Sequence, residues 1–273
     1  MSKLKFTILG SSGFIGSNVS KTLKNKNFDC YTPDVRKESL DGKNLGNVIY
    51  SLGVSDFRNK PLDTIEAHIC ILNKILKNCS FDSLLYISSG RMYYNVDSTL
   101  EENSLIGNPN MKNDLYNISK LQGELLCQSM NNSKIKIIRP SNVVGITAPS
   151  NLFISSLVKE AVTTGKIILH STLDSEKDYV YIDDLIELIP KIILSNKFSL
   201  YNIASGYNTT SKKIIDEIIR LTDCKIEIAP DAKKFSSSQI DITRIKNEFN
   251  FVPTNIIEKI ENVVKFYQKL NKN

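Results

Sequence analysis

Three glycines near the start of the chain constrain its fold more than any other feature. Gly10, Gly13 and Gly16 follow an apolar segment, residues 5–9, and open an amphipathic segment, residues 15–24. Glycine permits a sharp turn and a close approach by a phosphate, and a helix N-terminus attracts anions. The order strand, glycine loop, helix is typical of a dinucleotide-binding unit. We therefore expect the cofactor pyrophosphate to contact Gly10, Ser12, Gly13, Phe14, Ile15 and Gly16.

Apolar and amphipathic segments alternate over the first two thirds of the chain. The pattern predicts strands at 5–9, 29–32, 47–52, 83–87 and 134–138, and helices at 15–24, 64–77 and 115–129. Such alternation indicates an α/β fold, a Rossmann-type doubly wound parallel sheet. Further helices are expected at 152–163, 183–194, 212–221 and 256–270. We expect a Rossmann domain over 1–145 and, over 146–273, a smaller C-terminal substrate-binding lobe from which a segment near 178–204 returns to the sheet.

The composition argues against several classes of protein. Hydrophobic residues make up 41% and charged residues 23%, as in ordinary globular proteins. No apolar run approaches the ~20 residues of a membrane helix. Five scattered cysteines and two histidines show no metal-ligand spacing. The net charge of +6 comes from dispersed lysines, whereas a nucleic-acid binder concentrates them on one face. We expect a cytoplasmic protein with no membrane, nucleic-acid or metal partner.

A carboxylate follows the second expected strand. Asp34 lies 18 residues after Gly16, where it can accept hydrogen bonds from the adenosine ribose hydroxyls and would repel a 2′-phosphate. Arg36 has the opposite effect, because a guanidinium group there would hold that phosphate. NAD is therefore the expected cofactor, with NADP as the alternative.

A tyrosine and a lysine lie four residues apart on one expected helix. Tyr116 and Lys120 share a face of that helix, and an ammonium group beside a phenol favours the phenolate by lowering its pKa. Ser89 follows the strand at 83–87, at the sheet edge where ligands bind. A tyrosine–lysine pair alone is unspecific. The order glycine loop, serine, tyrosine and lysine carries the hypothesis of proton transfer to or from a substrate hydroxyl.

Together these segments resemble the extended short-chain dehydrogenase/reductase family, in its NAD-dependent nucleotide-sugar epimerase/dehydratase branch. The resemblance runs from Phe6 to about Pro253 and includes residues 48–53, 87–93, 116–120, 139–145, 178–184 and 241–253. It implies catalytic roles for Ser89, Tyr116 and Lys120. It also implies cofactor contacts at Asp34, Arg36, Leu52, Gly53, Tyr116, Lys120, Pro140 and Ser141, and substrate contacts at Ser89, Arg91, Asn142 and Arg58.

The chain departs from this family at several points. Only 13 residues separate Asp34 from Val48, so the usual third strand is expected to be reduced or missing, and Asp41 is the candidate that remains for adenine. Lys177 stands where the family often has arginine. The arginine that usually precedes the late aspartate, here Asp241, is absent.

The resemblance implies redox chemistry at a sugar carbon, most simply C4 epimerisation or 4-keto reduction in nucleotide-sugar or surface-polysaccharide biosynthesis. A dehydratase is the disfavoured alternative, because Gly90-Arg91 occupies the place of its Asp-Glu pair. A non-catalytic, cofactor-binding regulator of the same fold is another. His68, on the polar flank of its expected helix, is assigned a structural role.

The resemblance also implies a homodimer that pairs through the helix of Tyr116. The apolar stripe expected to form that contact comprises Ile69, Leu72, Leu76, Leu121, Leu125 and Leu126.

Overall fold

The computed structural model describes residues 4–93, 96, 98–103, 111, 114–147 and 152–272. The chain divides into two compact units. Unit 1 comprises residues 1–92, 104–140 and 185–202, and unit 2 comprises residues 93–103, 141–184 and 203–273. Among the helices of the described residues, none is both long enough and apolar enough to span a bilayer.

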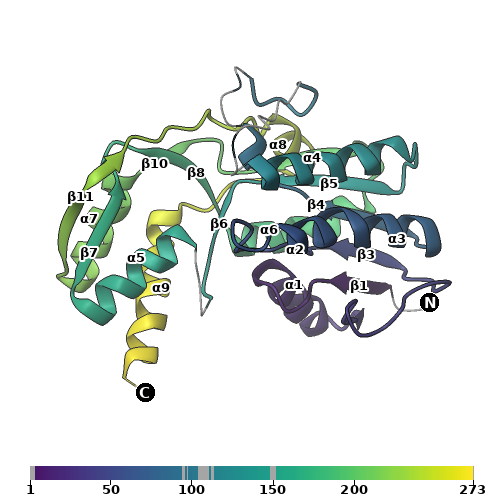
Figure 1. Cartoon of the computed structure of the whole chain (residues 1–273), viewed down its shortest axis with the longest axis horizontal. Helices are drawn as coiled ribbons and strands as arrows, with labels where there is room; N and C mark the ends of the chain where they lie inside the picture. Colours follow the sequence, from purple (N-terminus) through teal and green to yellow (C-terminus); the bar gives the residue numbers. More distant parts are fainter. Residues whose placement is uncertain are drawn as a thin grey trace. The chain divides into compact units, whose positions relative to one another are not determined.

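Unit 1 is built on a six-stranded sheet with the order β2-β1-β3-β4-β5-β9, of which Figure 1 labels β1, β3, β4 and β5. Five strands pair in parallel: β1 (Lys5–Leu9), β2 (Asp29–Tyr31), β3 (Asn47–Tyr50), β4 (Ser83–Ile87) and β5 (Ile135–Pro140). β9 (Leu200–Ile203) lies next to β5. Residues 32–46, all described, contain no strand. The parallel α/β sheet and the loss of the usual third strand are thus confirmed.

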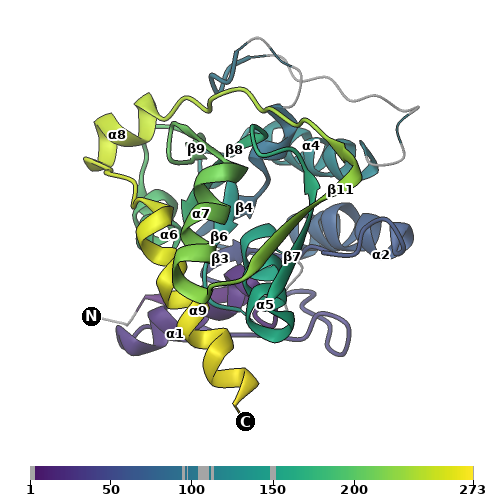
Figure 2. The same ribbon diagram turned by 90° about the vertical axis from the view of Figure 1, so that its left-hand side faces the viewer.

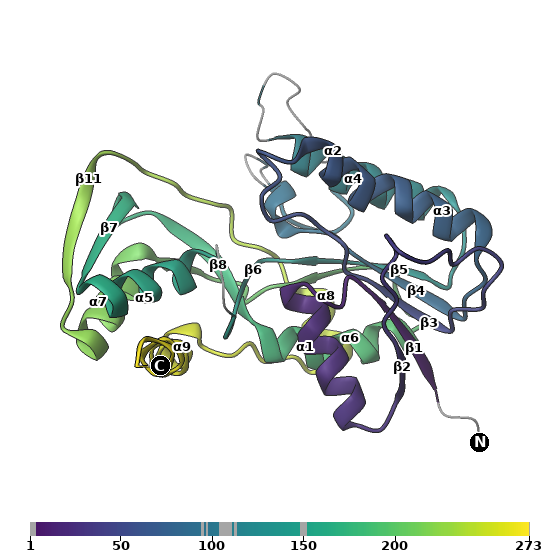
Figure 3. The ribbon, with the colours of Figure 1, turned by 60° about the horizontal axis from the view of Figure 1, so that its bottom comes forward.

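Helices cover both faces of this sheet, as Figure 3 shows. α1 (Phe14–Asn25) and α6 (Ile182–Leu194) lie on one face, and α2 (Pro61–Ile65), α3 (Ile71–Asn78) and α4 (Asp114–Ser129) on the other. Because both faces are covered, every residue of β3, β4 and β5 is buried. This explains why these strands read as continuous apolar runs rather than as alternating patterns.

The segment expected as one helix over residues 64–77 is interrupted. A π-helical turn, η1 (Glu66–Cys70), separates α2 from α3. Such turns are rare and occur frequently at functional sites. The Tyr50 hydroxyl donates a hydrogen bond to the carbonyl oxygen of Ala67 within this turn, at 2.6 Å. The expectation that His68 lies on a polar flank is wrong, because its side chain is fully buried, with 0% exposure.

The stripe expected for a dimer contact is also partly wrong. Leu72 and Leu76 are buried in the core of unit 1, with 0% and 9% exposure, beside Leu84 and Tyr86. They face the sheet because it offers the larger apolar surface within the same unit. Leu125 is the member of the stripe on α4 that is exposed, with 54% of its surface accessible.

Unit 2 contains two small sheets. One has the order β10-β8-β6 and the other pairs β11 with β7. These strands are β6 (Asn142–Val144), β7 (Lys166–Ser171), β8 (Glu176–Tyr181), β10 (Asn208–Thr210) and β11 (Lys225–Lys233). Its helices are α5 (Phe153–Thr164), α7 (Ser211–Thr222), α8 (Thr243–Phe249) and α9 (Ile256–Asn271). α5, α7 and α9 pack against one another (Figure 2).

Candidate active site

The glycine loop joins β1 to α1 and leaves the helix N-terminus open. Gly10 has a left-handed φ of +92°, and a Cβ there would lie 2.9 Å from the backbone of Ser51. A Cβ on Gly16 would clash with the Gly10 carbonyl oxygen. Gly13 is the exposed N-cap of α1, and no side chain caps the helix. The first N–H groups of α1 therefore lack helical partners, as a pyrophosphate site requires.

The flanking loop residues differ in exposure. Ser12 is exposed beside Gly13, whereas Phe14 and Ile15 are half-buried in the first turn of α1. Ser51, which the sequence did not single out, donates a hydrogen bond to the Leu9 carbonyl oxygen at 2.8 Å. This bond holds the end of β3 beside the loop.

Asp34 and Arg36 lie in the turn after β2 and contact each other. Asp34 Oδ1 accepts hydrogen bonds from the Arg36 backbone N–H at 3.1 Å and from Arg36 Nε at 3.5 Å. The backbone bond, followed by the charge of Arg36, lowers the pKa of Asp34. Both side chains reach solvent, and that of Arg36 is 81% exposed. Asp41 lies apart from this turn, where its Oδ1 accepts a hydrogen bond from Asn78 Nδ2 at 2.9 Å.

Ser89, Tyr116 and Lys120 meet beyond the carboxyl ends of β3 and β4. Ser89 follows β4 and its hydroxyl hydrogen-bonds the phenol of Tyr116. Lys120, one turn after Tyr116 on α4, donates to the carbonyl oxygen of Ile87 at 2.9 Å and to that of Leu52 at 3.3 Å. The chain therefore brings the three sequence-predicted residues together, because carboxyl ends of parallel strands share one edge of the sheet.

The charges in this cluster are distributed differently from the expectation. Burial raises the pKa of Tyr116, while the Ser89 hydrogen bond and the positive charge of Arg91 lower it. Burial lowers the pKa of Lys120 from 10.5 to about 7, against the opposing effect of Glu124. The expected lowering of the Tyr116 pKa by Lys120 is thus wrong. The charge that acts on the phenol is that of Arg91.

Arg91 lies in the short helical turn η2 (Gly90–Tyr93) directly after Ser89. Its guanidinium carbon is 5.2 Å from the ring centre of Phe57 and 5.8 Å from that of Tyr116. The two rings are 5.1 Å apart. Arg58 is exposed, with its guanidinium carbon 5.5 Å from the Phe57 ring. The sequence did not indicate a role for Phe57, because no local pattern shows that an aromatic residue in a loop will contact a helix far along the chain.

His68 adds an imidazole to the same cluster. Its ring meets the Tyr116 ring edge-to-face at 5.2 Å, and its Nδ1 is 2.8 Å from the hydroxyl oxygen of Ser119. A Cβ built on Gly53 would lie 3.6 Å from His68 Nε2 and 4.0 Å from Lys120 Nζ. Burial, and secondarily the charge of Lys120, lowers the pKa of His68 from 6.5 to about 2. The imidazole is therefore neutral at any physiological pH.

A buried ion pair fixes helix α4 to the sheet. Glu124, one turn beyond Lys120, accepts hydrogen bonds from Arg139 Nε at 2.9 Å and from Nη2 at 2.6 Å. Both side chains are at most 4% exposed. Removing one partner of such a pair leaves a buried charge and costs ~3–5 kcal/mol. The pair thus anchors the helix that carries Tyr116 and Lys120.

The remaining sequence-predicted residues follow β5. Pro140, the last residue of β5, is buried. In unit 2 the Ser141 backbone N–H donates to the Ile203 carbonyl oxygen at 2.9 Å, and Asn142 Nδ2 donates to the Asp178 carbonyl oxygen at 2.7 Å. The Asp178 carboxylate accepts from the backbone N–H groups of Ser205 and Gly206, both at 2.8 Å.

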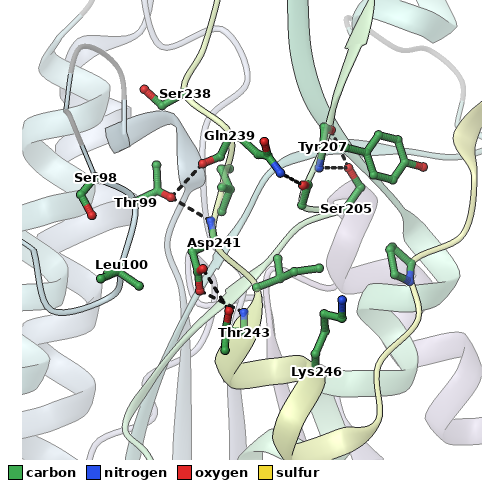
Figure 4. A pocket seen from close by; sticks show the side chains of 14 residues that line it. Ser98, Thr99, Leu100, Ser205, Tyr207, Ser238, Gln239, Asp241, Thr243 and Lys246 are labelled. Atoms are coloured by element: carbon green, nitrogen blue, oxygen red, sulfur yellow. Dashed lines mark hydrogen bonds between the residues drawn. The ribbon is translucent and has the colours of Figure 1, made fainter.

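Described residues of unit 2 line at least two surface hollows. One, of ≈310 Å³, contains Lys177, whose Nζ lies 4.4 Å from the Phe235 ring centre and 5.5 Å from that of Phe153. The other, of ≈890 Å³, contains Asp241 (Figure 4). There the Thr99 hydroxyl donates to the Gln239 carbonyl oxygen and accepts from the Asp241 backbone N–H, both at 2.8 Å. Among the described residues, no group of three or more histidines, cysteines and carboxylates is arranged to hold a metal.

Comparison with known proteins identifies relatives that catalyse several reactions. The chain is 24% identical over 269 residues to dTDP-D-glucose 4,6-dehydratase of Dictyostelium discoideum, a match that covers 80% of this chain but only 62% of that enzyme. It is 24% identical over 247 residues to GDP-6-deoxy-D-talose 4-dehydrogenase of Aggregatibacter actinomycetemcomitans, with 82% of each covered.

Solved structures show the same fold. UDP-glucuronic acid 4-epimerase of Bacillus cereus, in complex with UDP-glucuronic acid and NAD, superposes with a TM-score of 0.79 at 17% identity, covering 97% of this chain and 99% of that one. A model of the NAD dependent epimerase/dehydratase family matches residues 46–204, more than half of the chain. With its parallel sheet, glycine loop and the cluster around Tyr116, the chain belongs to the NAD-dependent epimerase/dehydratase family.

Proposed function

We propose that the chain catalyses oxidation or reduction at C4 of a nucleotide-linked sugar, as a C4 epimerase or a 4-keto reductase. The observation that carries this proposal is the hydrogen-bonded pair of Ser89 and Tyr116, with Lys120 bound to the Leu52 and Ile87 carbonyl oxygens beside it. This arrangement can hold one oxygen atom and exchange one proton with it. The interconversion of a carbinol and a ketone requires both of these.

Each residue of the cluster has a distinct task in this proposal. When bound, the nicotinamide ring supplies the acceptor or donor of hydride. The Tyr116 hydroxyl oxygen takes the proton from the C4 hydroxyl as that carbon is oxidised, and returns it on reduction. Ser89 donates a hydrogen bond to the same sugar oxygen. Arg91 stabilises the phenolate form, since its charge lowers the pKa of Tyr116.

The glycine loop fits the NAD that the family uses. The exposed N-cap Gly13 and the uncapped N-terminus of α1 suit a pyrophosphate. Gly53 has no side chain beside Lys120 Nζ, which leaves room for the nicotinamide ribose next to that donor. Asp34 favours NAD through the ribose hydroxyls, and Arg36 would serve NADP instead.

Within unit 2, the hollow around Lys177 is our candidate site for a nucleoside diphosphate. An ammonium group attracts the diphosphate, and the rings of Phe153 and Phe235 offer apolar surface to a base or ribose. Lys177 thus takes over the task for which many relatives use arginine. Asn142 on β6 pairs with Tyr179, two residues after Lys177 on β8, and is our candidate for a sugar contact.

Two alternatives are less favoured. The Dictyostelium relative is a dehydratase, but that chemistry needs an acid and a base after the serine, and the positions here hold Gly90 and Arg91. A cofactor-binding regulator would not need Ser89, Tyr116 and Lys120 to lie together. A cytoplasmic location and a homodimer complete the proposal.

The deciding experiment combines each nicotinamide cofactor with UDP-, GDP-, dTDP- and CDP-sugars and follows the products by NMR. An epimerase converts the sugar without net change in cofactor absorbance, whereas a reductase consumes reduced cofactor stoichiometrically. Tyr116→Phe should lower turnover by ~10²–10⁴ and leave cofactor binding intact, while Tyr267→Phe in unit 2 should retain activity. Normal turnover by Tyr116→Phe removes the tyrosine mechanism.

A further inference from the structure

The buried imidazole of His68 is locked in one tautomer by its neighbour. Ser119 Oγ donates its single proton to the Tyr116 carbonyl oxygen at 3.0 Å. The same oxygen is 2.8 Å from His68 Nδ1. Because a serine hydroxyl has one proton to donate, Oγ must accept from the ring. Nδ1 therefore carries the proton of the neutral imidazole, and Nε2 is left as a hydrogen-bond acceptor.

This acceptor has no partner among the described residues. His68 Nε2 is buried and unsatisfied. A Cβ built on Gly53 would lie 3.6 Å from His68 Nε2 and 4.0 Å from Lys120 Nζ, so both atoms lie close to the space beside Gly53. Buried polar atoms without partners are rare in native proteins, and those that occur call for a ligand, a water or a functional role. The unsatisfied atom and the Lys120 amine therefore border the same space.

The two groups are complementary for a hydroxyl-bearing ligand. An ammonium group can only donate, and the nearby Leu52 and Ile87 carbonyl oxygens already accept from Lys120. A sugar hydroxyl both accepts and donates, so it needs an acceptor for its own proton. His68 Nε2, which is buried and has no hydrogen-bond partner among the described residues, can serve as that acceptor.

From this geometry we infer that His68 binds the cofactor directly: Nε2 accepts a hydrogen bond from a hydroxyl of the nicotinamide-side ribose, while Lys120 donates to the same diol. The inference rests on the proposed function, because it takes NAD to lie along the glycine loop and across Gly53. The π-helical turn η1 serves this role by turning His68 into the core instead of toward solvent.

Imidazole nitrogen NMR tests the tautomer and the contact together. The chain has two histidines, so ¹⁵N-histidine labelling gives two sets of signals, and His170→Gln assigns them. In the cofactor-free protein His68 should show a protonated Nδ1 and an acceptor-type Nε2. Saturation with NAD should move the Nε2 resonance in the direction of an accepted hydrogen bond. A proton on Nε2, or an Nε2 signal unmoved at saturation, overturns the inference.

A thermodynamic cycle that combines removal of a ligand hydroxyl with removal of the His68 imidazole distinguishes a hydrogen bond to the cofactor from packing in the core. NAD analogues that lack the 2′- or the 3′-hydroxyl of the nicotinamide ribose are titrated against the wild type and His68→Phe, which preserves ring volume. One analogue should bind the wild type about tenfold more weakly than NAD, and the loss should be clearly smaller in His68→Phe, where only the Lys120 contact to the hydroxyl remains. If the wild type and His68→Phe lose the same factor in affinity for the analogue, the inference is overturned, because a side chain that only packs in the core does not interact with the ligand hydroxyl.

The outcomes distinguish this inference from the function on which it rests. Failure of the wild type to bind either nicotinamide cofactor overturns both. Tight NAD binding with no response at Nε2 and no coupling to a ribose hydroxyl overturns the role of His68 and leaves the proposed function standing. If His68→Phe does not fold, the NMR titration of the wild-type protein still decides.

Discussion

The guanidinium carbon of Arg91 lies 5.8 Å from the ring centre of Tyr116, and its charge lowers the pKa of that phenol against the effect of burial. Lys120, one helical turn from Tyr116, instead binds two backbone carbonyl oxygens and has its own pKa lowered to about 7. The two basic residues thus differ in what they act on. The charge of Arg91 acts on the Tyr116 phenol, and Lys120 Nζ lies 4.0 Å from a Cβ built on Gly53.

Arg91→Met should therefore raise the pKa of Tyr116 and move the rising limb of the kcat/KM profile for sugar oxidation to higher pH. We expect a loss of about tenfold at neutral pH, a part of the ~10²–10⁴ that such proton transfer provides. The measurement is kcat/KM from pH 6 to 10 with the substrate found by the screen. Arg220→Met, on the surface of unit 2, is the matched control. If the rising limb of the kcat/KM profile lies at the same pH in Arg91→Met as in the wild type, then Arg91 does not lower the pKa of Tyr116.

Lys120 should make the stability of the cofactor-free protein depend on pH. Its folded pKa of about 7 lies below the ordinary 10.5, so the unfolded chain binds more protons between these values. The free energy of unfolding therefore increases as the pH rises above about 7. Below that pH Lys120 stays protonated in the folded protein, which then bears the full cost of burying the charge. Lys120→Met removes the effect. Its stability relative to wild type should fall by about 1.4 kcal/mol per pH unit above pH 7.

Denaturant unfolding of both proteins at pH 6.5, 7.5 and 8.5 measures this difference. Lys21→Met, an exposed substitution on α1, controls for changes that are common to the whole protein. A gap between Lys120→Met and wild type that is the same at all three pH values would show that Lys120 keeps an ordinary pKa.

The turn after β2 should select NAD. Asp34 would place a negative charge against a 2′-phosphate, at a cost on the order of 1 kcal/mol for a unit pair 4 Å apart in water. Asp34→Asn should weaken NAD binding and narrow the preference over NADP, as measured by titration with both cofactors. Tighter binding of NADP by the wild type, lost in Arg36→Ala and kept in Asp34→Asn, would assign the choice to Arg36 instead.

A homodimer is expected, and the structure narrows the surface that would form it. Leu125 on α4 is 54% exposed and Leu62 on the adjacent α2 is 83% exposed, whereas Leu72 and Leu76 lie in the core. Leu125→Lys should shift the protein from dimer to monomer in light scattering at micromolar concentration. Leu194→Lys, an exposed leucine on α6, should leave the dimer intact. A monomeric wild type refutes the expectation outright.

Local patterns predicted much of unit 1. The strands β1 and β4 lie at the predicted residues, and α1 and α4 begin within one residue of their predicted starts, because apolar runs and helical periodicity are read over short windows. The gathering of Ser89 and Tyr116 also followed from the sequence, since parallel strands bring their carboxyl ends to one edge. In unit 2 the strands β6 and β10 have three residues each, too few to produce a recognisable period.

The sequence by itself determined the strand–loop–helix cofactor motif, the parallel sheet and the order of serine, tyrosine and lysine, since these depend on neighbours along the chain. Tertiary structure decided which side chains face one another. A π-helical turn buried His68, the sheet drew Leu72 and Leu76 inward, and Arg91 took its place over Phe57 and Tyr116. Burial and charge proximity are set by packing between segments far apart in the chain, and these two quantities control the pKa values on which the chemistry depends.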